Sequence, residues 1–214
     1  MILEVGAWVI EQAAQDCYEW LRAGLPPIRI AVNISPAQLR QANFTTQFLN
    51  ATGAWSTADA GLDVEITEGA LQGDSAVEIG RLEQLRASGV RIAIDDFGTG
   101  YSSLSRLSSL PVDTLKIDRS FVMRLDANSQ GGALVRTIIS LARAFSMTTV
   151  AEGVETPQQF AALQAAGCTQ SQGYLHSRPV PAAEFVALMR NGRDELTRPA
   201  APVEGALEAS AALT

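Results

Sequence analysis

VRIAIDDFGTGYSSLSRLSSLPVDTLKID, residues 90–118, contains two β-rich runs that end in charged residues. VRIAID at 90–95 and TLKID at 114–118 are short, and both place an aspartate at their last position. An unpaired carboxylate that interrupts an apolar strand is expensive, so Asp95 should have a metal ion or an ionic partner. The stretch therefore indicates buried strands that present charged side chains at their ends.

Further β-rich runs and helical patterns extend outward from this stretch. The other runs are IRIAVNI at 28–34, DVEIT at 63–67, TTVAE at 148–152 and QSQGY at 170–174. Apolar residues at helical spacing fall at 4–22, 36–49, 75–87, 131–145, 157–166 and 181–189. Alternation of strand and helix every ~20–35 residues is typical of βα units on a parallel sheet, and so predicts an α/β fold. We expect residues 1–190 to form one domain, and the Ala-, Pro- and Glu-rich run 191–214 to be disordered.

Composition narrows the function classes. The chain has 214 residues, 47% of them hydrophobic, and a formal net charge of −7. An acidic chain lacks the basic patch that binds duplex nucleic acid or an anionic membrane, so a bound phosphate ester would need a cation beside it. Cys17 and Cys168 form no CxxC pair, and with a single histidine no zinc site can be written. Reduced thiols, no signal peptide and no membrane-length apolar run predict a cytoplasmic protein.

Polar side chains recur where the predicted strands end. Oxygen-bearing residues at these ends suit hard cations such as Mg²⁺ or Mn²⁺: Asn33, Glu65, Asp95, Asp96 and Glu152. Lys116, Glu155 and Gln172 lie at the same ends. In a parallel barrel this end carries the active site. Each residue also has a structural interpretation, since Asp pairs often cap turns and Lys116 could form a salt bridge.

Several segments together resemble the EAL domain of bacterial cyclic di-GMP signalling. They are VNISPAQL at 32–39, EITE at 65–68, residues 94–122, VAEGVET at 150–156 and QGY at 172–174. The resemblance runs from about Val5 to Pro181 and implies a TIM-like barrel with one antiparallel strand. It also implies Mg²⁺- or Mn²⁺-dependent hydrolysis of cyclic di-GMP to linear pGpG, with two metal ions in each site.

The resemblance also implies roles for individual residues. Asn33, Glu65 and Asp95 would bind the first metal, and Asp95 would bridge to a second metal near Asp96 and Glu152. Lys116 and Gln172 would contact the attacking water, and Glu155 would be a supporting carboxylate. A loop that couples dimerisation to metal binding would comprise Phe97, Gly98, Thr99, Gly100, Tyr101, Ser102 and Ser103, and Glu68 would anchor it. The family further suggests a homodimer and a regulatory or diguanylate-cyclase-type domain outside this chain.

The sequence departs from the family in one respect. The Glu-Ala-Leu tripeptide is absent, together with the two strands that precede residue 1 in the family barrel and the arginine that contacts substrate phosphate. We therefore expect an incomplete TIM-like (β/α) barrel with six of eight strands, exposed sheet edges at 28–34 and 170–174, and weakened hydrolysis. His176 follows QGYL and is expected to be structural. Three interpretations stay open: an N-terminally truncated phosphodiesterase, a module that binds cyclic di-GMP or a protein partner without turnover, and an unrelated barrel.

Overall fold

The computed structural model describes residues 1–71, 76–99, 107–125 and 130–191. The chain divides into two compact units, Met1–Pro179 and Val180–Thr214. In the second unit the described residues contain the helix α9 (Ala182–Asn191). The run 192–214, predicted to be disordered, lies outside the described residues, and the predicted boundary at residue 190 stays a prediction.

A sheet of six parallel strands forms the centre of the first unit, in the order β1-β2-β3-β4-β5-β6. The strands are β1 (Arg29–Asn33), β2 (Gly61–Thr67), β3 (Ile92–Phe97), β4 (Thr114–Ile117), β5 (Thr148–Ala151) and β6 (Gln170–Ser171). Parallel neighbours in chain order are what successive βα units produce. The expected incomplete TIM-like barrel is therefore confirmed, and the antiparallel strand of the family is not among the six described strands.

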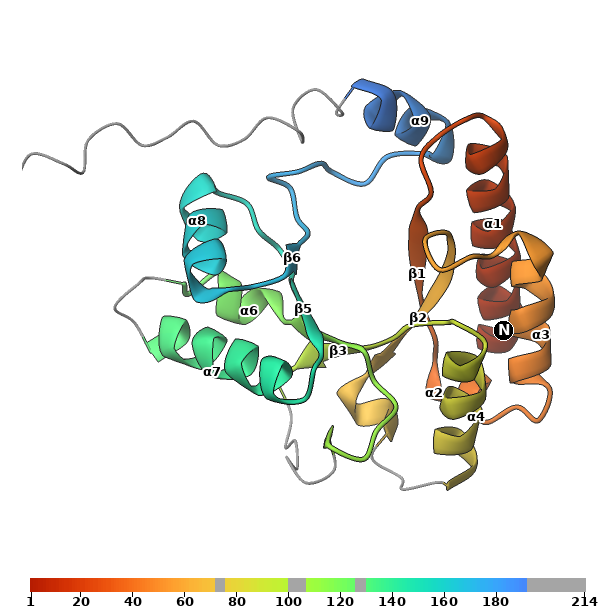
Figure 1. Ribbon diagram of the computed structural model, residues 1–214, viewed down its shortest axis with the longest axis horizontal. Coiled ribbons are helices and arrows are strands. Elements are labelled where there is room, and N and C mark those ends of the chain that lie inside the picture. The colour runs from red at the N-terminus through yellow and green to blue at the C-terminus, as the bar shows by residue number, and fades with distance from the viewer. Residues whose placement is uncertain (72–75, 100–106, 126–129, 192–214) are drawn as a thin grey trace, which may run out of the picture. The chain divides into compact units, whose positions relative to one another are not determined.

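Helices connect the strands and cover one face of the sheet (Figure 1). They are α1 (Ile2–Arg22), α2 (Pro36–Leu39), α3 (Phe44–Thr52), α4 (Ala76–Ala87), α6 (Arg119–Val122), α7 (Gln130–Ala144) and α8 (Pro157–Ala166), with short 3₁₀ turns η1 (Gly53–Trp55) and η2 (Glu68–Leu71). Helix α1 packs on β1 and β2, and α7 packs on β4 and β5.

The single helix expected over 36–49 is wrong. A capping box at Ser35 and Gln38 starts α2, which stops at Leu39. Tight turns then follow, in which the Gln41 N–H donates to the Gln38 carbonyl and the Phe44 N–H donates to the Gln41 carbonyl. The chain restarts as α3, and this change of direction buries Phe44 and Phe48 in the core.

The two faces of the sheet differ in chemistry. Side chains of one parity face the helices and form the core, among them Val32, Val64, Ile94, Leu115 and Ala151. Side chains of the other parity are mostly polar or small and line the concave face, with Val150 an apolar exception. The nearly continuous apolar runs at 28–34, 63–67, 90–95 and 148–152 predict strands buried on both faces. At β1, however, the concave side is open, with Ala31 and Asn33 exposed. The apolar core therefore lies outside the sheet, and the inner face is left for charged groups.

Candidate functional site

Strand register places the predicted site residues on the concave face. Asn33 pairs with Glu65, and Thr67 with Asp95, so these side chains share one face. Lys116 pairs with Val150, two residues before Glu152, and Gln172 follows β6 with the same parity. The carboxyl ends of parallel strands meet at one edge, so side chains far apart in sequence converge there.

Lys116 is the centre of this cluster. Its ammonium lies 2.7 Å from Glu65 Oε2, 3.0 Å from Asp95 Oδ1 and 2.6 Å from Glu152 Oε1, and its side chain is 4% exposed. Burial favours the neutral amine, but hydrogen bonds and charges from Glu152 and Glu65 outweigh it and raise the pKa of Lys116 well above its ordinary value. The group is a buried cation that faces three carboxylates, so the cluster as a whole is negative.

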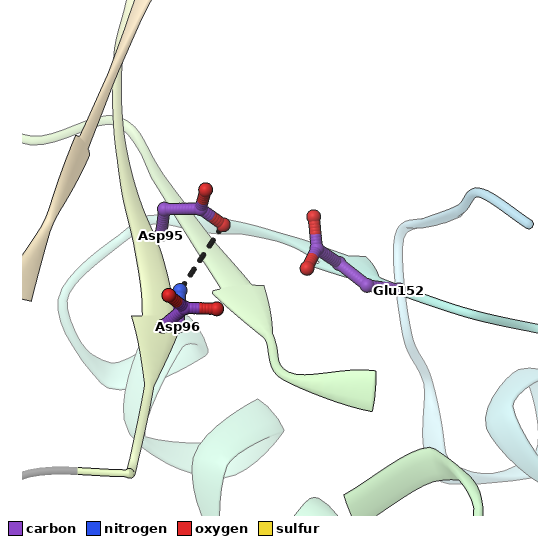
Figure 2. Close-up of side chains that lie close together, drawn as sticks. All are labelled: Asp95, Asp96 and Glu152. Atoms are coloured by element: carbon purple, nitrogen blue, oxygen red, sulfur yellow. Dashed lines mark hydrogen bonds between the residues drawn. The ribbon is translucent and has the colours of Figure 1, made fainter. Parts of the chain in front are cut away.

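A β-bulge brings Asp96 beside Asp95. Between β3 and β4 the register shifts, so the chain from Ile94 to Phe97 spans one residue more than the opposite strand. Asp96 has φ +54°, and its N–H donates to Asp95 Oδ1 at 3.1 Å. Figure 2 shows the carboxylates of Asp95 and Asp96, from the end of β3, opposite that of Glu152. Bulges commonly re-aim side chains next to functional sites, and this one directs two consecutive carboxylates to the same place.

Glu152 links the two halves of the cluster. Its Oε1 accepts from Lys116 and, at 3.1 Å, from Gln172 Nε2. Burial raises the pKa of Glu152, and Asp95 and Glu65 raise it further, while Lys116 acts in the opposite direction. Slight burial, together with Asp95 and Asp118, likewise raises the pKa of Asp96. Both carboxyls are crowded by like charge, which a further cation would relieve.

The donor set fits a hard divalent cation. Asp95, Asp96 and Glu152 each offer a carboxylate oxygen, and these oxygens lie within 4.8 Å of one another. Glu65 is connected to this group because it forms an ion pair with Lys116, which also pairs with Asp95 and Glu152. Asn33 lies beside Glu65 on the exposed part of the same face. All donors are oxygens, as Mg²⁺ and Mn²⁺ prefer.

Glu155 lies in a second, adjacent network. It forms an ion pair with Arg119 at 2.7 Å, and its backbone N–H donates to Gln159 in the capping box of α8. The aliphatic part of Arg119 packs over Gly153, where an added Cβ would lie 2.3 Å from Arg119 Cγ. Arg119 and Gly153 were not among the site residues predicted from the sequence. The adjacency of Gly153 to Glu152 was the available signal, but the contact joins segments that are distant in sequence.

The predicted coupling loop is described only at its start. The Gly98 N–H donates to Glu68 Oε2 at 3.4 Å, a long hydrogen bond that connects the loop to the end of β2. Phe97 is buried in the core, and Thr99 Oγ1 donates to the Asp96 carbonyl. Gly100, Tyr101, Ser102 and Ser103 lie outside the described residues. Coupling to a dimer stays a prediction.

Comparison with known proteins settles the family. The sequence model of the EAL domain matches residues 1–179. The chain belongs to the EAL domain family. This EAL chain is 40% identical over 199 residues to the cyclic di-GMP phosphodiesterase NbdA of Pseudomonas aeruginosa, which covers 93% of the chain and 25% of NbdA. It is 41% identical over 187 residues to the bifunctional diguanylate cyclase/cyclic di-GMP phosphodiesterase MucR of the same species, which covers 87% of the chain and 27% of MucR.

A solved structure agrees with this assignment. The PaMucR phosphodiesterase in complex with c-di-GMP superposes with a TM-score of 0.79 at 41% identity, over 86% of this chain and 74% of that one. The EAL chain spans about a quarter of the length of the curated relatives it matches, which are multidomain proteins. EAL phosphodiesterases are metal-dependent, and the acidic cluster of this chain is in keeping with that. No helix in the described ranges combines the length and apolarity needed to cross a membrane.

Proposed function

We propose that this chain provides most of the active site of a cyclic di-GMP phosphodiesterase that produces linear pGpG. The observation that carries the proposal is the convergence of Glu65, Asp95, Asp96 and Glu152 around buried Lys116 at the carboxyl ends of the strands. Relatives named as cyclic di-GMP phosphodiesterases and the PaMucR complex support the choice of substrate.

In this proposal the acidic residues hold two Mg²⁺ or Mn²⁺ ions. Asn33, Glu65 and Asp95 would bind the first ion, and Asp95, Asp96 and Glu152 the second. When bound, the ions would supply a hydroxide nucleophile near neutral pH and neutralise the phosphodiester, which an acidic protein needs. The bulge at Asp96 and the register of β2, β3 and β5 fix the donors before substrate arrives, so little reorganisation is needed.

Lys116 and Gln172 act beside the metal ligands in this scheme. A cationic lysine at this depth can orient a nucleophilic water and stabilise negative charge, but it cannot accept a proton while its pKa stays raised. Gln172 Nε2 donates to Glu152 and holds that carboxylate in one orientation. Glu155 supports the same loop through Arg119.

A binding module without turnover is the second candidate. None of the 214 residues forms the Glu-Ala-Leu tripeptide, so a further metal-binding glutamate of the family is not among them. Loss of one carboxylate weakens metal binding and misplaces the nucleophile more than it affects contacts to substrate. Cyclic di-GMP would then bind in a metal-dependent way and dissociate without being hydrolysed.

Hydrolysis and binding should be measured on the same samples. The 214-residue protein is incubated with Mn²⁺ and cyclic di-GMP, pGpG is followed by chromatography, and binding is measured by calorimetry. We expect Mn²⁺-dependent binding, with turnover below the ~1–10³ s⁻¹ of typical enzymes. Glu152→Ala should abolish the Mn²⁺-dependent signals, whereas Glu83→Ala, an exposed carboxylate on α4, should not.

The outcomes separate the candidates. Slow turnover supports the phosphodiesterase, and metal-dependent binding without turnover supports the binding module. Binding that Glu152→Ala leaves intact contradicts the metal assignment. A homodimer coupled through 97–103 and Glu68, and a regulatory domain in the same polypeptide, belong to this proposal as well. A cytoplasmic location goes with it, because Cys17 and Cys168 are free thiols.

A further inference from the structure

Lys116 is the only lysine of the chain, in which the other 15 of the 16 basic side chains are arginines. It is also among the few buried charged residues of the described structure. An ammonium is a compact charge with three N–H donors, whereas a guanidinium is a planar fork. Three carboxylates from β2, β3 and the end of β5 surround the Lys116 ammonium at 2.6–3.0 Å. The ammonium therefore has one donor for each carboxylate.

The contacts are distributed unevenly over the carboxylate oxygens. Lys116 makes its shortest contacts to Glu65 Oε2, Asp95 Oδ1 and Glu152 Oε1. The Asp96 N–H also donates to Asp95 Oδ1, and Gln172 also donates to Glu152 Oε1. Protein donors thus converge on one oxygen of each of these two carboxylates. The second oxygen of each carboxylate makes neither of these contacts, so we assign it as the atom that would serve a metal ion.

We propose that Lys116 is a positioning residue, a resident counter-cation that assembles Glu65, Asp95 and Glu152 into a ready-made site whether or not divalent ions are bound. The three carboxylates, from β2, β3 and the end of β5, repel one another, and a buried unpaired carboxylate is costly. Lys116 offsets that repulsion in the folded chain. Its positive charge also opposes divalent cations at short range, so it lowers metal affinity while it keeps the site in shape.

The two effects have opposite signs, which separates this role from simple packing. Lys116→Met keeps the length of the side chain and removes the charge. In EDTA the variant should melt roughly 10 °C below wild type, because it leaves buried carboxylates without their partner. With Mn²⁺ bound, the melting temperature of Lys116→Met should return most of the way to that of wild type. Its Mn²⁺ affinity, measured by calorimetry, should be about tenfold or more above that of wild type. A residue that only packs would lose stability and metal affinity together.

Two further measurements complete the test. In protein labelled with ¹⁵N-lysine, the metal-free wild type should show a single slowly exchanging ammonium resonance, because there is one lysine and it is buried. If Lys116→Met does not fold with or without Mn²⁺, the double variant Lys116→Met/Glu65→Gln should fold again, since it removes one negative charge as well. Recovery supports the charge argument, and failure to recover overturns it.

Other results also overturn the proposal. They are a Lys116→Met protein that melts within about 2 °C of wild type in EDTA, unchanged or weaker Mn²⁺ affinity, or a rapidly exchanging lysine signal. The proposal rests on the proposed function only in the choice of Mn²⁺. The melting and resonance experiments in EDTA need neither cyclic di-GMP nor turnover, so a chain that fails to hydrolyse it can still pass them.

Discussion

Asp96 combines a ligand chemistry with a backbone conformation that few residues adopt. Its φ of +54° lies in the left-handed region, where Asn and Asp are tolerated because their short polar side chains bond locally. The Thr99 side chain and backbone N–H both donate to the Asp96 carbonyl and hold the turn. The conformation that re-aims the strand end is therefore part of the site.

Substitution of Asp96 should separate strain from charge. Asp96→Val should lower the free energy of unfolding by about 1–2 kcal/mol relative to Asp96→Gly, because a β-branched residue is strained at positive φ and glycine is not. Both variants should lose Mn²⁺ binding to a similar degree. Urea denaturation and calorimetry measure the two effects, and equal stability of the two variants would contradict the strained turn.

Cys17 gives a pH dependence that does not involve the acidic cluster. It is fully buried at the base of α1, and burial raises the pKa of its thiol above the ordinary value of 9.0, against smaller opposing effects of Gly61 and Arg29. Well below pH 9.0 the Cys17 thiol is protonated in both the folded and the unfolded state, so the stability contributed by burying the neutral thiol is fully present. Above it the unfolded chain ionises first, and stability is lost as the pH rises through the folded-state pKa.

Urea denaturation of wild type and Cys17→Ala between pH 8 and pH 10.5 measures this effect. The urea midpoint of wild type should fall more steeply with pH, and the difference between the two curves isolates Cys17 from other groups that titrate there. A thiol reagent at pH 7 should label half-buried Cys168 and leave Cys17 unmodified until urea is added. Parallel curves would show that the thiol is not shielded.

At the scale of elements, the loop from β5 to α8 depends on a close approach between Gly153 and Arg119. Gly153 has φ +65°, and a Cβ there would meet the Arg119 side chain. Gly89 has φ +86°, with nothing within 4 Å of an added Cβ. An alanine at either position would be strained by the positive φ, but only at Gly153 would its Cβ also clash with a neighbour. Gly89 is therefore a matched control for Gly153.

Gly89→Ala should lower the free energy of unfolding by about 1 kcal/mol through strain alone. Gly153→Ala should lower the free energy of unfolding by more than Gly89→Ala does, because its Cβ also clashes with Arg119. It should also weaken Mn²⁺ binding, because the clash displaces neighbouring Glu152. The double variant Gly153→Ala/Arg119→Ala should recover part of both losses. Equal losses at the two glycines, measured by urea denaturation, would show that Arg119 does not constrain the loop.

A second element-scale device joins β1 to β2 at the end opposite the acidic cluster. Arg29 donates to Asp63 at 2.9 Å and to the carbonyls of Thr57, Ala58, Leu62 and Gly89, and both partners are largely buried, at 9% and 15% exposed. The Arg86–Asp113 pair has a similar N–O distance of 2.9 Å, but Arg86 is 52% exposed.

Removal of the cation should therefore have unequal effects. Arg29→Met should lower the free energy of unfolding by about 3–5 kcal/mol, because it leaves the largely buried Asp63 carboxylate without its cation, with only the Arg91 N–H still donating to it. Arg86→Met should lower it by no more than about 1 kcal/mol. Both are measured by urea denaturation at pH 7. Similar losses would mean that Arg29 is hydrated in solution.

At the scale of the whole molecule, the described sheet has two free edges, β1 and β6. The Ile34 N–H donates to Glu65, and the Ile28 carbonyl accepts from Gly61, so even-numbered residues of β1 bond to β2. Odd-numbered residues, including Ala31, direct their N–H and C=O groups away from β2. Such an edge is a template for pairing with another chain.

The 214-residue protein should therefore self-associate through β1. Ala31→Pro removes an N–H at the free edge but none of the hydrogen bonds between β1 and β2. The variant should show a larger monomer fraction than wild type in sedimentation velocity. Ala31→Val keeps the N–H and should associate like wild type. If both variants associate equally, another surface is responsible.

The amino-acid sequence by itself determined the order of elements and the residues at the strand ends. Short β-rich runs with an acidic or amide residue at or near the end predicted parallel strands and placed Glu65, Asp95 and Glu152 at the same end of the sheet, because strand propensity and strand direction can be inferred from local sequence. It did not predict the break at Arg40–Asn43, since a helical pattern continues through a turn that only the burial of Phe44 explains.

Only the tertiary structure decided how these residues meet. Lys116 and Glu65 are 51 positions apart, and whether the ammonium contacts solvent or three carboxylates depends on the curvature of the sheet and on the bulge at Asp96. The packing of Arg119 on Gly153 likewise joins segments more than 30 residues apart. Such contacts depend on the summed geometry of several strands, which no local pattern encodes.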